Sequence, residues 1–105
     1  MGYEYGFVFS LPLQAPQLEQ LLHCLQTTHS WRLMQAIPGE TSSLLRYAYH
    51  AAGPLAWGED FLLEVSSQQV YLLLHTATAD QTVRVLIWLQ QGLASLGLAG
   101  TLAEL

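Results

Sequence analysis

The first amphipathic pattern in the chain lies in its first third, directly after two prolines. Four leucines follow the i, i+3, i+4, i+7 spacing that forms one apolar stripe on a helix: Leu18, Leu21, Leu22 and Leu25. Pro16 suits the first turn of such a helix, because its missing N–H would have no intrahelical partner there. The pattern predicts a helix over about residues 15–27.

A second helix is predicted towards the C-terminus, where the chain carries good capping chemistry. Thr78 and Gln81 have the spacing of a capping box, Asp80 lies in the first turn, and Gly97 can end the helix. One face of this predicted helix contains Val83, Leu86, Ile87, Gln90, Leu93 and Ala94. Apolar residues outside that face, Val85, Trp88 and Leu89, predict that little of this helix is wetted.

The segments between and around these helices have the composition of strands. Aromatic, β-branched and other apolar residues concentrate in 5–11, 31–37, 43–50, 61–66 and 69–76, and 98–105 is a candidate edge strand. Turn residues at 38–40 and 66–68 predict two antiparallel hairpins. The run 70–74 is apolar without alternation, which predicts a strand covered on both faces.

Together these elements predict an α+β fold with a mainly antiparallel sheet of about five strands and two helices. The order along the chain is strand, helix, four strands, helix and a candidate final strand. A length of 105 residues suits one hydrophobic core, so we expect residues 1–105 to form a single domain.

The amino-acid composition excludes some classes of protein. Apolar residues make up 51% of the chain, which excludes a disordered protein, yet no apolar run approaches the roughly 20 residues of a membrane span. No signal-peptide pattern opens the chain and Cys24 is the one cysteine, so we expect a soluble, cytoplasmic protein.

The charged residues of the chain indicate which classes of partner it can bind. The chain has no lysine, three arginines (Arg32, Arg46 and Arg84) and a net charge of −5, so it lacks the basic patch that binds nucleic acid. Only 10% of its residues are charged. A chain this apolar and weakly charged often covers part of its surface with a partner or a second copy, so a protein interface is expected and a homodimer is compatible with it.

The sequence carries no recognisable catalytic, cofactor or metal motif. Phosphate-binding glycine loops, the serine-hydrolase elbow and paired cysteines are missing from it. His23 next to Cys24 does not form a nucleophile–base pair on a helix, because adjacent residues point about 100° apart. His50 and His75 are candidates for a ligand pocket, but ordinary strand positions explain both. We therefore expect a non-enzymatic protein without cofactor or metal.

An acidic cluster stands out in the stretch from 53 to 65. Glu59 and Asp60 follow Trp57 in a loop flanked by glycine and proline, whereas Glu64 lies on a strand face with Leu62. A tryptophan beside two carboxylates is typical of a contact surface for a basic protein, so Trp57, Glu59, Asp60 and Glu64 are the predicted partner-binding residues. An acid–base site, a metal site and a solvated loop without a role remain alternatives.

A small, acidic, cysteine-poor α+β chain with the loop Trp57-Gly58-Glu59-Asp60 resembles the immunity proteins that bacteria encode beside polymorphic toxins. The resemblance covers the general character of the whole chain and rests on no motif, so it carries over no family site. It implies a protein that binds a cognate toxin domain and blocks it, with no chemistry of its own. Acidic immunity proteins commonly oppose basic toxins.

Two alternatives stay open. Small acidic secretion chaperones resemble this chain in size and α+β make-up, and the surplus apolar residues Val85, Trp88 and Leu89 would serve dimerisation or client binding. A dimeric α+β protein with a small-molecule pocket or enzymatic site near His50, His75, Tyr47 or Tyr49 is the other alternative.

Overall fold

The computed structural model of the protein describes residues 3–49, 59–75 and 77–105. In that part of the chain, strands and helices follow one another as β1 (Tyr3–Phe9), α1 (Ala15–Gln26), β2 (Arg32–Ile37), β3 (Ser42–Ala48), β4 (Phe61–Ser66), β5 (Gln69–Leu74), α2 (Ala79–Ser95) and β6 (Gly100–Glu104). The predicted helices and strands are all present, with boundaries that differ by a few residues.

The strands form one antiparallel sheet in the order β2-β3-β4-β5-β1-β6. This confirms the predicted α+β fold, and the sheet has six strands where we expected about five. The candidate edge strand at 98–105 is present as β6. Gly100 lets it lie close against β1. A Cβ atom at Gly100 would lie 2.3 Å from the Val8 carbonyl oxygen and 2.6 Å from the Phe7 ring.

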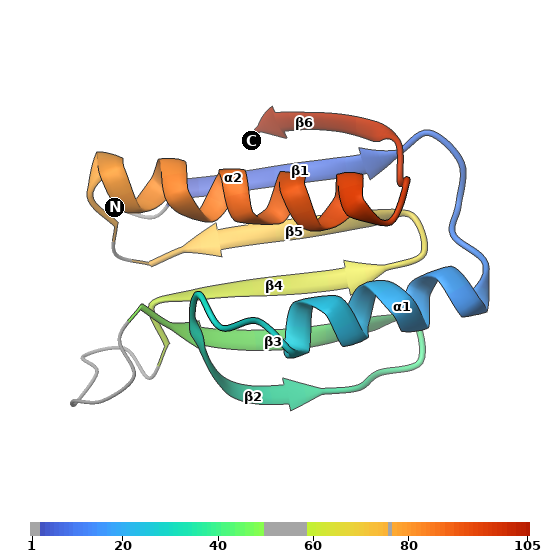
Figure 1. Ribbon diagram of the computed structural model, residues 1–105, viewed down its shortest axis with the longest axis horizontal. Coiled ribbons are helices and arrows are strands. Elements are labelled where there is room, and N and C mark those ends of the chain that lie inside the picture. The colour runs from blue at the N-terminus through green and yellow to red at the C-terminus, as the bar shows by residue number, and fades with distance from the viewer. Residues whose placement is uncertain (1–2, 50–58, 76) are drawn as a thin grey trace.

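Both helices lie on the same side of the sheet, so the molecule has two layers (Figure 1). The core lies between them and is built from alternate residues of the strands and one stripe of each helix. Its fully or almost fully buried members are Phe7, Phe9, Leu21, Leu25, Leu45, Tyr47, Phe61, Leu63, Val65, Val70, Leu72, Leu74, Val85, Leu89 and Leu93. No described helix is long and apolar enough to cross a membrane.

The prediction that residues 70–74 are covered on both faces is wrong. Val70, Leu72 and Leu74 are fully buried under the helices, whereas Tyr71 and Leu73 point to the other side and are only half-buried. Because both helices pack on one face, the opposite face of β5 has no layer of described elements over it. Its apolar residues are therefore a surface feature, which an unbroken apolar run cannot reveal.

The apolar face that the sequence singled out on α2 is buried only in part, and the expectation that little of this helix is wetted is wrong, because many of its residues are exposed. Val85, Leu89 and Leu93 are the residues that pack into the core, whereas Val83 is 53% exposed and Ile87 is 47% exposed. The helix carries two overlapping apolar stripes, and its rotation on the sheet decides which of them is buried. Trp88 joins the buried side through edge-to-face contacts with Tyr47 and Phe61.

The ends of α2 confirm the local prediction. The Thr78 hydroxyl accepts a hydrogen bond from the Gln81 backbone N–H, and the Gln81 side-chain oxygen accepts one from the Thr78 N–H. Gly97 follows the helix with a φ of 70°, in the left-handed region where a side chain is strained.

Candidate functional site

The strand register determines which side chains share the surface opposite the helices. Directly paired residues of neighbouring strands point to the same face. One row across the sheet is Ile37, Leu44, Glu64, Tyr71, Gly6 and Ala103, and the adjacent row is Gln35, Arg46, Leu62, Leu73 and Glu4. We call the surface formed by these two rows, with Val8 and Leu105 beside them, the open face.

Much of the open face is apolar. Val8 is 53% exposed, and Leu62 and Leu73 form a half-buried pair at the centre of the sheet. Leu105 is 68% exposed and its methyl groups lie over Gly6, about where a side chain at that position would be. These residues give the sheet an apolar surface that no described element covers.

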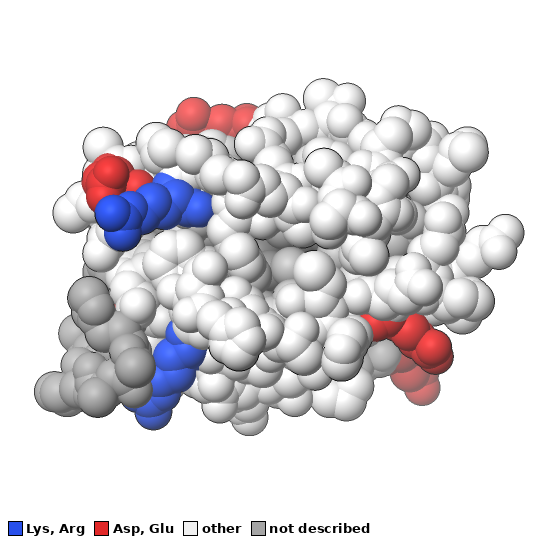
Figure 2. All heavy atoms as spheres, viewed as in Figure 1, with Lys and Arg blue, Asp and Glu red and all other residues white. Residues whose placement is uncertain are grey.

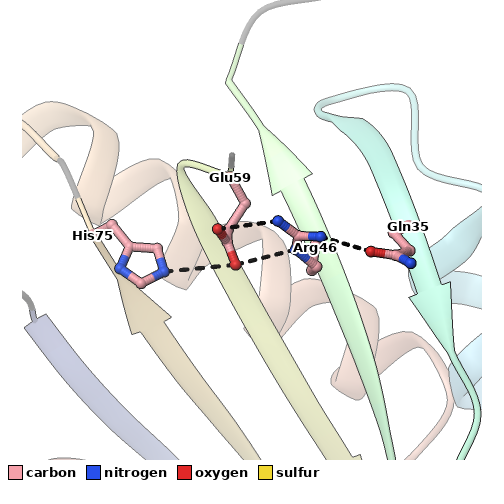
Figure 3. A network of polar contacts seen from close by, with 4 residues as sticks. All are labelled: Gln35, Arg46, Glu59 and His75. Carbon is pink, nitrogen blue, oxygen red and sulfur yellow. Dashed lines mark hydrogen bonds and ion pairs between the residues drawn. The ribbon is translucent and has the colours of Figure 1, made fainter. Parts of the chain in front are cut away.

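A polar network lies at one end of the open face and links β2, β3 and the adjacent ends of β4 and β5 (Figure 3). Arg46 donates to both oxygens of Glu59, from Nε at 3.1 Å and from Nη2 at 3.4 Å, and its Nη1 donates to the Gln35 side-chain oxygen at 2.6 Å. His75 Nε2 lies 3.8 Å from the same Glu59 carboxylate. A two-point arginine–carboxylate contact holds both groups in a fixed orientation.

Glu59 therefore has an internal structural role. Its side chain is only 12% exposed, and it bridges Arg46 of β3 and His75, which follows β5. Both of its oxygens accept hydrogen bonds from Arg46, which holds the carboxylate against the sheet. The network connects the ends of neighbouring strands next to residue 60.

The predicted partner-binding residues do not form one group. Trp57 lies outside the described residues, as does His50. Asp60 is built into the sheet, since its carboxylate accepts a hydrogen bond from the Tyr49 N–H at 2.8 Å and its backbone N–H bonds to the Tyr47 carbonyl. Glu64 lies in the middle of β4, exposed on the open face and opposite Phe61, Leu63 and Val65, as the strand pattern predicted.

Glu64 instead shares the open face with two residues that the sequence did not single out, Tyr71 and Glu4. Tyr71 is paired with Glu64, and its hydroxyl donates a hydrogen bond to the Glu4 carboxylate. That hydrogen bond, together with partial burial and the negative charges of Glu4 and Glu64, raises the pKa of Tyr71 to about 12. The predicted hairpin of 61–66 and 69–76 accounts for the pairing of Glu64 with Tyr71, but no sequence signal joins Glu4 to them, because Glu4 and Tyr71 are far apart in the chain.

The charges of Glu4 and Glu64 have no cationic neighbour in the part of the chain that the structure describes. The ion pairs found there are Arg46 with Glu59, His75 with Glu59, and Arg84 with Asp80 on α2. Glu64 accepts a hydrogen bond from the Ser42 hydroxyl at 3.2 Å. A hollow of about 210 Å³ on the open face is lined by Glu64, Ser66, Gln69 and Tyr71.

The other candidate groups have ordinary surroundings. Among the described residues no three histidine, cysteine or acidic side chains gather as metal ligands. Cys24 is half-buried where the helices meet, and a Cβ atom at Gly92 would lie 3.7 Å from its sulfur. His23 beside it is exposed.

The two sides of the molecule therefore differ in character. On the helix-covered side, Figure 2 shows mostly uncharged surface with isolated charged groups towards its edges. The open face combines apolar side chains with two carboxylates, Glu4 and Glu64, that form no ion pair with another described residue. The chain matches no protein-family model and no curated protein sequence.

Proposed function

We propose that this chain is a non-enzymatic binding protein of the cytoplasm that neutralises a partner protein, in the manner of the immunity proteins it resembles. The observation that carries the proposal is the open face, a whole side of the sheet without a covering layer in the described structure. Exposed apolar surface of this extent on a small domain marks an interaction site.

The size of the open face supports a protein as its partner. Strands about 4.8 Å apart and about six residues long give a sheet of roughly 29 by 20 Å, or about 600 Å² before side-chain relief is counted. A standard protein interface buries about 800 Å² on each partner. The open face, with a rim of neighbouring residues, approaches that size.

The polar groups support binding over catalysis. The carboxylate closest to a histidine, Glu59, is held by Arg46, and Asp60 is bonded to the backbone of Tyr49. The carboxylates that remain accessible, Glu4 and Glu64, lie on the open face among apolar residues. This arrangement suits complementarity with a partner surface.

The secretion-chaperone alternative loses the observation that favoured it. Its surplus apolar residues, Val85, Trp88 and Leu89, pack against or within the core of the chain itself. The toxin-neutralising proposal does not depend on them.

The test is a protection assay with the product of the adjacent upstream reading frame. Co-expression of this chain is expected to restore growth, and the two proteins should co-elute in size-exclusion chromatography. Leu73→Lys, on the open face, is expected to abolish both effects, whereas Ile87→Lys, at an exposed apolar position on α2, should preserve them. A wild-type chain that neither binds nor protects would overturn the proposal.

A further inference from the structure

We propose that the partner surface docking on the open face is cationic as well as apolar, and that lysine or arginine side chains lie against Glu64 and Glu4 on either side of Tyr71. This inference rests on the proposed function, because it specifies the chemistry of the partner that the same surface binds.

The register gives these charges a defined spacing. Glu64 and Tyr71 are directly opposite each other on β4 and β5, and Glu4 lies on β1, one strand further and two residues along. Two strand spacings and two residue rises separate the Glu64 and Glu4 backbones by about 12 Å. Two cations that are two turns apart on a helix, about 10.5 Å, match that separation.

The unpaired charges exclude a neutral occupant. Arg46 is already bonded to Glu59 and Gln35, and among residues 3–49, 59–75 and 77–105 no cation lies within ion-pair distance of Glu4 or Glu64. A neutral apolar partner would remove both carboxylates from water with one hydroxyl hydrogen bond to each and no cation to balance the charge, which is unfavourable. A partner that brings its own cations avoids this penalty.

A second copy of the chain is disfavoured for the same reason. β4 and β5 are the two central strands of the six, so a face-to-face pair would bring Glu64 of each copy close to the shared centre. Like charges brought together in a desolvated interface repel each other. The net charge of −5 adds to the repulsion.

The surroundings of Glu64 and Glu4 suit long basic side chains. The hollow beside Glu64 is also lined by Ser66, Gln69 and Tyr71, and the side-chain oxygens of Gln69 and Tyr71 can accept hydrogen bonds. Leu62 and Leu73 lie in the adjacent row, where the aliphatic stem of a lysine or arginine can pack while its charged end reaches a carboxylate. The open face therefore fits an amphipathic basic element.

The experiment titrates the ¹⁵N-labelled protein with a helical peptide of leucine, alanine and lysine whose lysines are seven positions apart. Chemical-shift changes are expected in β1, β4 and β5 and not along α1 or α2. Binding should weaken as salt is raised, because exposed ion pairs are screened. A peptide with glutamate in place of every lysine should not bind.

Matched variants test the carboxylates. Glu4→Gln with Glu64→Gln should weaken binding of the lysine peptide about five- to tenfold, as expected for two partly exposed ion pairs. Glu19→Gln with Glu104→Gln removes the same charge from exposed positions away from the open face and should leave the affinity unchanged. Equal weakening by both double variants would reduce the effect to net charge and overturn the inference.

Three further outcomes would also contradict it. These are equal binding of the glutamate peptide, shift changes confined to the helices, and concentration-dependent shifts on the open face without peptide, which would assign the surface to a second copy. The growth assay distinguishes a failure of the cationic-docking inference from a failure of the proposed function. Protection that survives Glu4→Gln with Glu64→Gln but not Leu73→Lys would leave the function and overturn the cationic docking.

Discussion

Tyr47 joins the two layers of the molecule through a single polar group inside the core. Its ring stacks on Phe61 with centroids 4.8 Å apart, and its hydroxyl donates a hydrogen bond of 2.7 Å to the Leu25 carbonyl near the end of α1. Burial raises the pKa of this tyrosine above its usual value, because a phenolate would have no solvent around it. The residue thus couples β3 to α1.

Tyr47→Phe is expected to lower the free energy of unfolding by about 1–2 kcal/mol, since it leaves a buried carbonyl without its donor. Urea denaturation measures the change. Tyr5→Phe is the control, because the Tyr5 hydroxyl has no hydrogen bond within the described residues, and we expect a change below about 0.5 kcal/mol. Equal losses in both variants would contradict a special role for Tyr47.

The buried and hydrogen-bonded tyrosines predict that the fold weakens in alkali. Burial, followed by the charge of Asp60, raises the pKa of Tyr49 to about 12, and the hydrogen bond to Glu4 raises that of Tyr71 to about 12. In this range the folded state holds more protons than the unfolded state, whose tyrosines titrate near 10. Their contribution to stability is therefore complete below about pH 10 and is lost as the pH rises towards about 12.

Urea midpoints measured on both sides of this pH range test the prediction. The wild-type midpoint should fall with rising pH, and Tyr71→Phe should reduce the decline, because one shifted group is removed. A midpoint that stays constant from about pH 10 to about pH 12 would contradict the assignment.

The helices show how local chemistry fixes an element's ends. In α2, Thr78 and Gln81 exchange two hydrogen bonds and Asp80 lies in the first turn. Thr78→Ala should lower the free energy of unfolding by about 1 kcal/mol, because the Gln81 N–H loses its acceptor. Thr78→Ser keeps the hydroxyl and should restore most of the loss in the same urea measurement. Failure of serine to restore stability would argue for a methyl contact instead.

At the scale of the whole molecule, two neighbouring residues of β5 can be used to test which side of the sheet is covered. Leu72 is fully buried under the helices, whereas Leu73 is half-buried on the open face. Leu72→Ala should cost about 3 kcal/mol of unfolding free energy and Leu73→Ala less than about 1 kcal/mol. Similar costs for the isolated protein would mean that the open face is covered in solution.

The sequence predicted the elements well because each depends on neighbours within one or two turns. The leucine spacing of α1, the capping box of α2 and the turns at 38–40 and 66–68 are all local signals, and the structure confirms them. Pairing a strand with a distant one is not a local property. The place of β1 between β5 and β6 could therefore not be derived from periodicity.

The candidate site was predictable only in part for the same reason. Glu64 was correctly placed on a strand face away from Phe61, and the predicted hairpin brings Tyr71 onto the neighbouring strand, but Glu4 comes from β1, which meets β5 only in the folded sheet. The internal role of Glu59 depends on Arg46, thirteen residues earlier on a neighbouring strand. Whether Trp57, Glu59, Asp60 and Glu64 contact a partner stays a prediction.

The sequence by itself determined the α+β class, the helices and strands, the lack of a basic surface and the absence of recognised catalytic motifs. The tertiary structure decided the order of the strands, the rotation of α2 and the location of both helices on one face. The physical reason is that an apolar stretch of sequence indicates only that its surface is more stable away from water. Packing between distant elements determines which of those surfaces the chain buries and which it leaves exposed.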